Sequence, residues 1–230
     1  MSQGTARTLN HYALFAFTED WWRADPATRH QAGEAIAASF GDVARAVDFY
    51  QIFPAEHAVD FCVWTAIEAD ELPAADRFFD RLARAIAPHR RWIRPALTLW
   101  GYTRPSQYSR ASRSAQEIDP FAAERRPYLV IYPFVKTAAW YALPHEERQR
   151  MMNEHIRIGK QYPEISQLLL YSFGIQDQEF VVVYEMDDLR QFSDLVAELR
   201  GAEGRIHTER DTPLHTALHR SAEEIFDIFG

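Results

Sequence analysis

A repeated order of secondary structure is the strongest constraint that this sequence places on its fold. In both halves of the chain the apolar patterning predicts strand, helix, strand, strand, helix, strand. The first half has expected strands at 11–18, 47–53, 61–67 and 96–102, with helices at 26–45 and 73–87. The second half has expected strands at 128–136, 167–173, 180–186 and 212–218, with helices at 144–161 and 189–202.

Two apolar runs mark corresponding places in the two halves, FCVW at 61–64 and FVVV at 180–183, about half the chain apart. The order of elements is that of the ferredoxin-like βαββαβ unit. We therefore predict an α+β chain of duplicated ferredoxin-like units, joined into a barrel-like (dimeric ferredoxin-like) arrangement with its helices outside. We place the N-terminal half at residues 1–110, a linker at 111–126 and the C-terminal half at 127–230. The linker-like composition, rich in serine and arginine, already begins near Thr103.

The composition narrows the class of protein. A formal net charge of -8 argues against a nucleic-acid partner, because phosphate binding needs a basic surface. Cys62 is the single cysteine, so no disulfide within the chain is possible. The first residues contain no apolar targeting segment, and no apolar run reaches membrane-spanning length. We therefore expect a cytoplasmic protein with no membrane span.

The stretch 126–174 carries the residues that point to chemistry. Side chains alternate along the strand 128–136, so Tyr132 and Lys136 share one face. The following helix begins at Pro144, a residue suited to the first helical turn. On this helix His155 shares an apolar face with Met151 and Met152.

A histidine on an apolar helix face has two interpretations. It is either a hydrogen-bonded core residue or an axial ligand of haem iron, which methionines can flank. The pattern alone leaves both interpretations open. A wider set of residues, scattered through the second half, bears on the choice. These residues are Tyr132, Pro133, Phe134, Lys136, Trp140, Tyr141, Leu143, Pro144, Glu147, Arg148, Met151, Met152, His155, Gly159, Tyr162, Gln167, Ser172, Phe173, Gly174, Asp177, Glu179, Phe180, Leu195, Val196 and Arg200.

In these residues the second half resembles the chlorite dismutase family, which includes haem-containing chlorite dismutases and coproheme decarboxylases. The resemblance implies the duplicated ferredoxin-like fold, an iron porphyrin (haem b or coproheme) in the second half, and a homo-oligomer, commonly a pentamer. It implies that His155 is the proximal iron ligand, with Met151 and Met152 among the porphyrin contacts. A carboxylate would orient the other nitrogen of His155, and Glu203 is our candidate.

The resemblance also implies roles for residues on the strands. Tyr132 falls where coproheme decarboxylases have their redox-active tyrosine, and Lys136 fits the lysine that contacts a propionate. Gln167 falls at the distal position when counted back from Ser172, whereas counting forward from His155 gives Leu168. The implied activity is the hydrogen-peroxide-dependent oxidative decarboxylation of coproheme to haem b, with Tyr132, Lys136 and Gln167 as catalytic residues.

Other functions remain open at this stage. A haem b enzyme that degrades chlorite or uses peroxide shares His155 but predicts a distal arginine, and neither Gln167 nor Leu168 is one. Arg157 is a candidate to reach the pocket instead. A non-enzymatic haem-binding protein needs His155 and not Tyr132, and a non-haem monooxygenase shares only the fold.

Overall fold

The computed structural model describes residues 7–108 and 114–230, so residues 1–6 of the expected signal-free N-terminus and 111–113 of the expected linker lie outside it. The elements of the first half are β1 (Thr8–Phe17), α1 (Glu19–Arg23), α2 (Pro26–Ser39), β2 (Ala46–Gln51), β3 (Phe61–Glu68), α3 (Ala74–Ile86), η1 (Ala87–His89) and β4 (Ile93–Thr103). Those of the second half are β5 (Tyr128–Lys136), α4 (Ala138–Ala142), α5 (His145–Gly159), β6 (Ser166–Tyr171), β7 (Phe180–Met186), α6 (Leu189–Arg200), η2 (Glu203–His207), β8 (Thr208–Arg210), β9 (His215–Arg220) and α7 (Ala222–Phe229). Within the described residues, no helix is long and apolar enough to cross a membrane.

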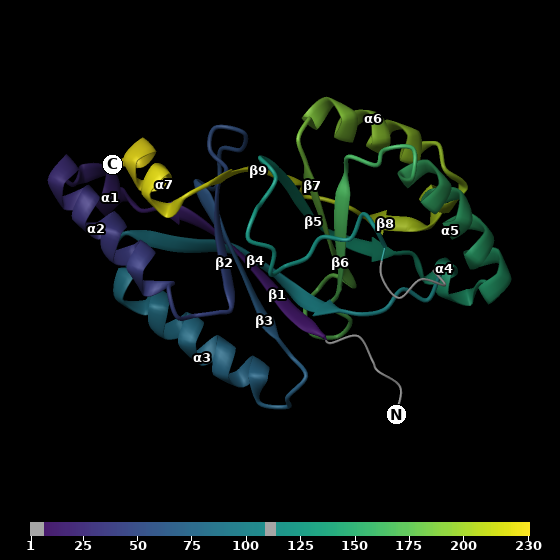
Figure 1. Ribbon diagram of the computed structural model, residues 1–230, viewed down its shortest axis with the longest axis horizontal. Helices are drawn as coiled ribbons and strands as arrows, with labels where there is room; N and C mark the ends of the chain where they lie inside the picture. The colour runs from purple at the N-terminus through teal and green to yellow at the C-terminus, as the bar shows by residue number, and fades with distance from the viewer. Residues whose placement is uncertain (1–6, 109–113) are drawn as a thin grey trace.

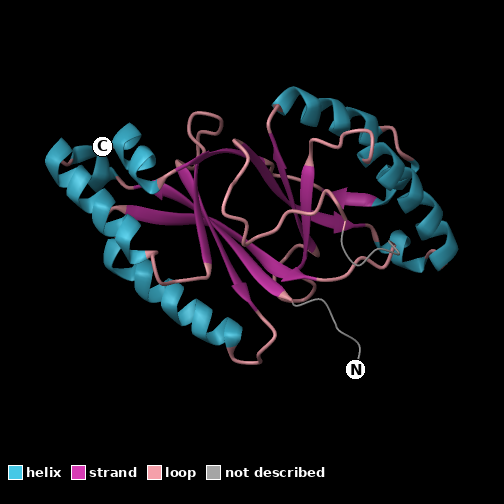
Figure 2. Ribbon diagram, viewed as in Figure 1, coloured by secondary structure: helices cyan, strands magenta, loops and turns pink. Residues whose placement is uncertain are grey.

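The strands confirm the predicted duplication. The spatial order is β4-β1-β3-β2 in the first half and β9-β5-β7-β6 in the second, so each half has its fourth, first, third and second strands side by side. The outer strands of the halves then pair with each other, β2 with β9 and β4 with β6. The order of eight strands closes on itself, with β8 added beside β5 (Figures 1 and 2). Our division at 110 and 127 stays a prediction, because the halves share this hydrogen-bonded ring.

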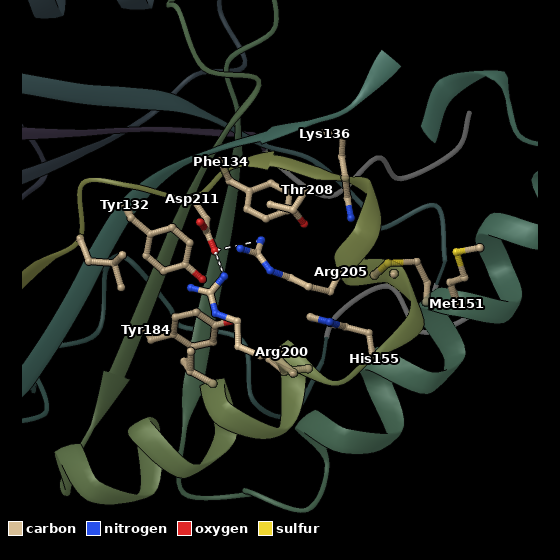
Figure 3. A pocket seen from close by; sticks show the side chains of 16 residues that line it. Tyr132, Phe134, Lys136, Met151, His155, Tyr184, Arg200, Arg205, Thr208 and Asp211 are labelled. Atoms are coloured by element: carbon tan, nitrogen blue, oxygen red, sulfur yellow. Dashed lines mark hydrogen bonds and ion pairs between the residues drawn. The ribbon is translucent and has the colours of Figure 1, made fainter. Parts of the chain in front are cut away.

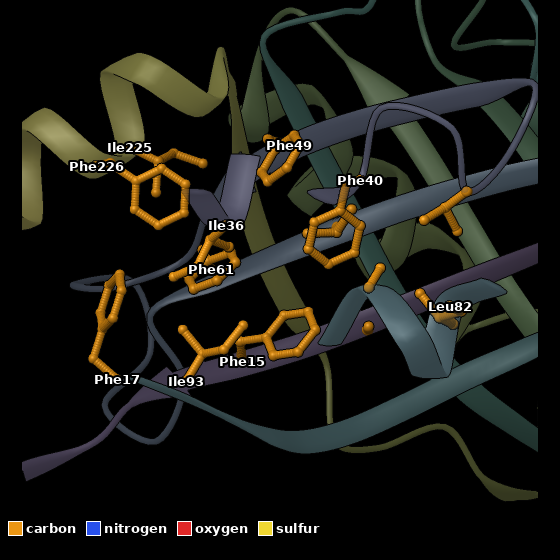
Figure 4. Packing of buried hydrophobic residues seen from close by; sticks show 14 of the residues in the cluster. Phe15, Phe17, Ile36, Phe40, Phe49, Phe61, Leu82, Ile93, Ile225 and Phe226 are labelled. Atoms are coloured by element: carbon orange, nitrogen blue, oxygen red, sulfur yellow. The ribbon is translucent and has the colours of Figure 1, made fainter. Parts of the chain in front are cut away.

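Alternation of side chains along the strands creates three apolar layers. The inner faces of the two sheets meet around residues such as Tyr12, Tyr50, Trp64, Leu129 and Val183. The outer face of the first half packs against α2, α3 and α7, which Figure 4 shows through the phenylalanines around Phe15, Phe40 and Phe226. The outer face of the second half packs against α5 and α6. Helices therefore cover only the outer faces, at opposite ends of the molecule (Figure 1).

Several predicted boundaries differ from the observed ones. The helix expected at 26–45 ends at Ser39, although Asp25 caps its start as its side chain accepts a hydrogen bond from the Thr28 amide at 3.0 Å. The last strand, expected at 212–218, is β9 at His215–Arg220, preceded by the short β8. Pro213 has no amide hydrogen to donate to a strand ladder, which agrees with the start of β9 at His215 rather than at residue 212.

The C-terminal helix α7 docks on the chain's own first half. Ser221 and Glu224 form a capping box at its start. Phe226 packs so closely on α2 that a Cβ on Gly33 would lie 2.7 Å from the Phe226 Cβ. The last helix thus returns to the first half, and β9, which leads into it, bridges the two sheets.

Arg125, from the segment between the halves, ties both sheets together inside the ring. Its side chain is 1% exposed, and its Nε donates to Asp48 of β2 at 3.0 Å. Its Nη1 lies 3.6 Å from Glu185 of β7, and its guanidinium lies 4.3 Å from the centre of the Trp64 ring. Burial raises the pKa of Glu185 to about 7, with Arg125 opposing that rise. Removing Arg125 would leave the buried Glu185 and the partly exposed Asp48 without the charge of the guanidinium.

We expect Arg125→Ala to lower the free energy of unfolding by about 3–5 kcal/mol, because breaking a buried ion pair strands its partner charges. Urea denaturation at pH 7.5 measures this. Arg77→Ala is the matched control, because Arg77 pairs with Glu71 in solvent and such pairs contribute about 0–1 kcal/mol. Equal losses of unfolding free energy in the two variants would contradict the role of Arg125 in holding the two halves together.

A glycine marks the closest approach of β4 to β6. A Cβ on Gly101 would lie 2.6 Å from the Ser172 Oγ and 2.7 Å from the Tyr171 backbone oxygen, whereas a Cβ on Gly159 would meet nothing within 4 Å. We expect Gly101→Ala to cost about 1–3 kcal/mol of stability through overpacking. Gly159→Ala should be neutral or stabilise by up to about 1 kcal/mol. Thermal unfolding of both variants checks the difference.

Candidate functional site

A cavity of about 100 Å³ opens between the outer face of the second sheet and the helices α5 and α6. Strands β5 and β7, helices α5 and α6, and the segment from η2 to the start of β9 all contribute side chains to it (Figure 3). The lining residues are Tyr132, Phe134, Lys136, Met151, Met152, His155, Tyr184, Val196, Leu199, Arg200, Ala202, Gly204, Arg205, Thr208, Asp211 and Leu214. Apolar, aromatic and charged groups thus share one small space.

Strand β5 presents Tyr132, Phe134 and Lys136 to the cavity, as the alternation of its side chains predicts. Ile131, directly before Tyr132, points to the opposite side, into the layer between the two sheets. Lys136 reaches inward, with its Nζ 4.3 Å from the centre of the Trp140 ring. A single strand therefore supplies an aromatic hydroxyl and an amine to the same site.

Helix α5 brings His155 to the opposite wall, with Met151 and Met152 beside it. Glu146 and Glu147 in its first turn stabilise the positive end of the helix. Loss of water around the ring, with the charge of Lys136 second, lowers the pKa of His155 to about 4. No hydrogen bond within the described residues engages the ring. His155 is therefore a neutral imidazole with a lone pair available to a metal ion.

Tyr132 and Tyr184 form a pair on the sheet wall. Their rings stack with centroids 6.4 Å apart and an interplanar angle of 23°. Burial is the main cause that raises the pKa of Tyr132 well above its ordinary value, and hydrogen bonding to Tyr184 adds to the rise. Tyr132 is thus a protonated phenol at neutral pH, held beside a second phenol.

Two arginines and an aspartate complete the site. The Arg200 Nη1 lies 2.6 Å from the Asp211 Oδ2, and the Arg205 Nη1 lies 3.2 Å from the same oxygen. Lys136 extends into the cavity from β5, and Arg205 from η2 turns its guanidinium toward Asp211 (Figure 3). Burial first, and Arg205 second, lower the pKa of Lys136 to about 8. The cavity is therefore strongly cationic, which suits a ligand with carboxylates.

The structure separates the two candidates for the distal position. Gln167 pairs with Tyr184 in the β6–β7 ladder, so its side chain is on the cavity face of the sheet, although it does not line the cavity. Leu168 pairs with Val183 and is buried in the layer between the sheets. A residue on that inner face cannot reach the cavity, so of the two candidates for the distal position only Gln167 lies on the right face of the sheet.

Two other expected residues lie away from the cavity. Glu203, the candidate partner of His155, instead forms an ion pair with Arg150 on the surface. This placement corrects that expectation, because the Arg150 guanidinium takes both carboxylate oxygens of Glu203. Arg157 is exposed on α5 and does not line the cavity.

Sequence reasoning missed Tyr184, Arg205 and Asp211 as residues of the site, and it named Arg200 only within the family resemblance, without a role. Tyr184 has a detectable signal, because it lies in the predicted strand 180–186 on the same face as the apolar Val182 and Met186. Arg205 and Asp211 have no such signal in the sequence, since they lie in short segments without periodicity. Their convergence depends on the turn from α6 into β8.

The geometry defines a class of protein, a duplicated ferredoxin-like chain whose second half holds a cationic cavity with a neutral histidine. The family model described as Chlorite dismutase matches residues 21–220. The coproheme decarboxylase of Mycolicibacterium smegmatis is 30% identical over 168 residues, which cover 72% of this chain and 69% of that protein. The chain belongs to the chlorite dismutase family.

Further similarities agree with the family. A putative heme-binding protein of Halobacterium salinarum is 41% identical over 78 residues, which cover 32% of this chain and 16% of that protein. A mutant chlorite dismutase from Candidatus Nitrospira defluvii superposes with a TM-score of 0.84 at 20% identity, covering 96% of this chain and 95% of that one. The putative chlorite dismutase TA0507 gives a TM-score of 0.77 at 22% identity, covering 96% and 99%. These structures share the fold.

Lys136 offers a direct test of the site's electrostatics, because the chain contains only one other lysine, the exposed Lys160. We expect the ¹³C-methylated amine of Lys136 to titrate with a midpoint near pH 8 in NMR spectra. Arg205→Gln should raise that midpoint, since a neighbouring positive charge disfavours the protonated amine. The Lys160 signal serves as the internal reference. A Lys136 midpoint that is unchanged in the variant would contradict the proximity of the two cations.

Proposed function

We propose that this protein catalyses the hydrogen-peroxide-dependent oxidative decarboxylation of coproheme to haem b. The observation that carries the proposal is the sharing of one cavity by Tyr132, a neutral His155 and three cationic side chains. Membership of the chlorite dismutase family and similarity to a coproheme decarboxylase support it. In this reaction the iron porphyrin is the substrate and also supplies the redox chemistry.

The residues present fit an iron porphyrin that carries carboxylates. His155 offers an uncharged nitrogen to the iron. Lys136, Arg200 and Arg205 offer charge-assisted hydrogen bonds to propionates, and the two guanidiniums match a carboxylate in shape. A cavity of about 100 Å³ has room for a few water molecules only, so lining side chains must move when the substrate enters. Met151 and Met152 are suited to this, because an unbranched thioether adapts its shape readily.

Each propionate that reacts becomes a vinyl group. One propionate, one hydrogen peroxide and one proton give one vinyl group, one carbon dioxide and two waters. The peroxide accepts the two electrons that the propionate loses. Two rounds convert coproheme to haem b. The substrate contributes the iron. The protein therefore binds and orients the substrate and relays the oxidising equivalent to the propionate.

Tyr132 is the residue proposed to relay the oxidising equivalent. It gives up an electron and its phenolic proton, and the resulting radical takes a hydrogen atom from the propionate side chain, which restores the phenol. The carboxylate then leaves as carbon dioxide when the second electron is lost. Lys136 holds the reacting carboxylate, and Gln167 is our candidate for the polar residue on the peroxide side.

Chlorite degradation by a resident haem b is not favoured. Chlorite degradation would need an arginine at the distal position on β6, and the sequence of β6, SQLLLY, contains no arginine. The two arginines in the cavity come from α6 and η2 and are paired with Asp211. We also propose, from the family resemblance, a cytoplasmic homo-oligomer, with a pentamer expected in sedimentation velocity experiments.

Tyr132→Phe tests the proposal. We expect the substitution to lower kcat for coproheme decarboxylation at least about a hundredfold with little change in coproheme affinity, because the hydroxyl acts in the reaction and not in binding. Chromatography of porphyrins after peroxide addition follows the loss of carboxylates through a monovinyl intermediate. Tyr162→Phe is the control, since Tyr162 bonds Glu198 on the surface. A Tyr132→Phe enzyme that decarboxylates coproheme at the wild-type rate would contradict the role assigned to Tyr132.

A further inference from the structure

Asp211 occupies an unusual place in the cavity. It lies in the short connection between β8 and β9, and its side chain is 18% exposed. A single oxygen, Oδ2, accepts a hydrogen bond from the Arg200 Nη1 at 2.6 Å and forms an ion pair with the Arg205 Nη1 at 3.2 Å. These two ion pairs are the contacts that the structure gives its carboxylate (Figure 3). An anionic ligand that approaches the two guanidiniums must therefore share them with Asp211 or displace it.

The charges of the cavity are unbalanced. Lys136, Arg200 and Arg205 contribute three cations to the lining, and Asp211 is the one carboxylate among the lining residues. Glu179 lies close enough to Lys136 to act on it, but its Oε2 already accepts from the Lys136 amide at 2.8 Å and the Tyr141 hydroxyl at 2.6 Å. Glu179 keeps its negative charge near Lys136, but the cavity lining itself carries more positive than negative charge, which favours an anionic ligand.

We propose that Asp211 is a placeholder carboxylate, which pairs with Arg200 and Arg205 whenever substrate carboxylates are absent and yields them to the substrate on binding. The inference rests on the proposed function. A reaction that removes carboxylates beside the partly exposed guanidiniums of Arg200 and Arg205 would leave them without the substrate's anions. Asp211 supplies one from the protein itself, both before the substrate binds and after carbon dioxide is lost.

The location of Asp211 allows this exchange. The carboxylate is on a connection and not within a strand, so its side chain can turn away without breaking a ladder hydrogen bond. The cost of displacing it weakens binding of the substrate, whose carboxylates compete for the arginines. It weakens binding of the product less, because the product has two carboxylates where the substrate has four. Asp211 thus lowers affinity for the tetracarboxylate more than for the product.

Binding of metal-free porphyrins, which cannot react, tests the proposal by fluorescence titration. The probes are coproporphyrin III, with four carboxylates, and protoporphyrin IX, with two. We expect Asp211→Asn to tighten coproporphyrin binding roughly fivefold to tenfold, because one nearby negative charge and its competition are removed. Protoporphyrin binding should stay within about twofold. Asp211→Glu, which keeps the charge, should bind coproporphyrin as the wild type does.

Asp80→Asn is the matched control, because Asp80 pairs with Arg84 on the exposed face of α3 and its loss changes the net charge equally. Asp211→Ser is a second charge-removing variant if Asp211→Asn fails to fold. Unchanged or weaker coproporphyrin binding in the charge-removing variants would overturn the proposal, as would equal tightening of both porphyrins. Binding of neither porphyrin by the wild-type protein would overturn the proposed function itself, and this inference with it.

Discussion

The rest of the structure depends on the pairing of the outer strands of the two halves. A four-stranded ferredoxin-like sheet leaves two edges with unpaired amides and carbonyls, which are prone to association with other chains. In this chain β2 pairs with β9 and β4 pairs with β6, so each half covers the edges of the other. The ring that results gives every strand an inner and an outer face. Its closest contact requires a residue without a side chain at Gly101.

The inner and outer faces of the strands pack against different partners, and this difference determines where the site lies. The inner faces pack on each other and include Ile131, Leu168 and Val183. On the outer face of the second half, neighbours of these residues, including Tyr132 and Tyr184, meet α5 and α6 around the cavity. A one-residue slip in any of these strands would exchange the two sets. The register of β5, β6 and β7 thus decides which side chains can act.

Two clusters of charge, one buried inside the ring and one partly exposed at the cavity, have different roles. Arg125 lies inside the ring with Asp48 and Glu185, and backbone carbonyls of residues 119 and 120 accept its remaining donors. The cavity cluster of Arg200 and Arg205 has only Asp211, with Lys136 adding a further cation. The first cluster is satisfied by the protein and stabilises the fold. The second carries excess positive charge, which is the property of a site that awaits an anionic ligand.

The sequence by itself determined the features that depend on near neighbours along the chain. Periodicity predicted the duplicated order of elements, the shared face of Tyr132 and Lys136, and the shared helix face of His155, Met151 and Met152, because each pattern extends over a few residues. Tertiary structure decided what depends on distant segments meeting. Through the ladder with β7 it placed Gln167 on the outer face of the sheet and Leu168 on the inner face. It paired Glu203 with Arg150 on the surface, and it brought Tyr184, Arg200, Arg205 and Asp211 into the cavity. Such arrangements involve separate strands, helices and connections, and they form only because the closed ring of strands fixes the faces of the sheet and the ends of the helices.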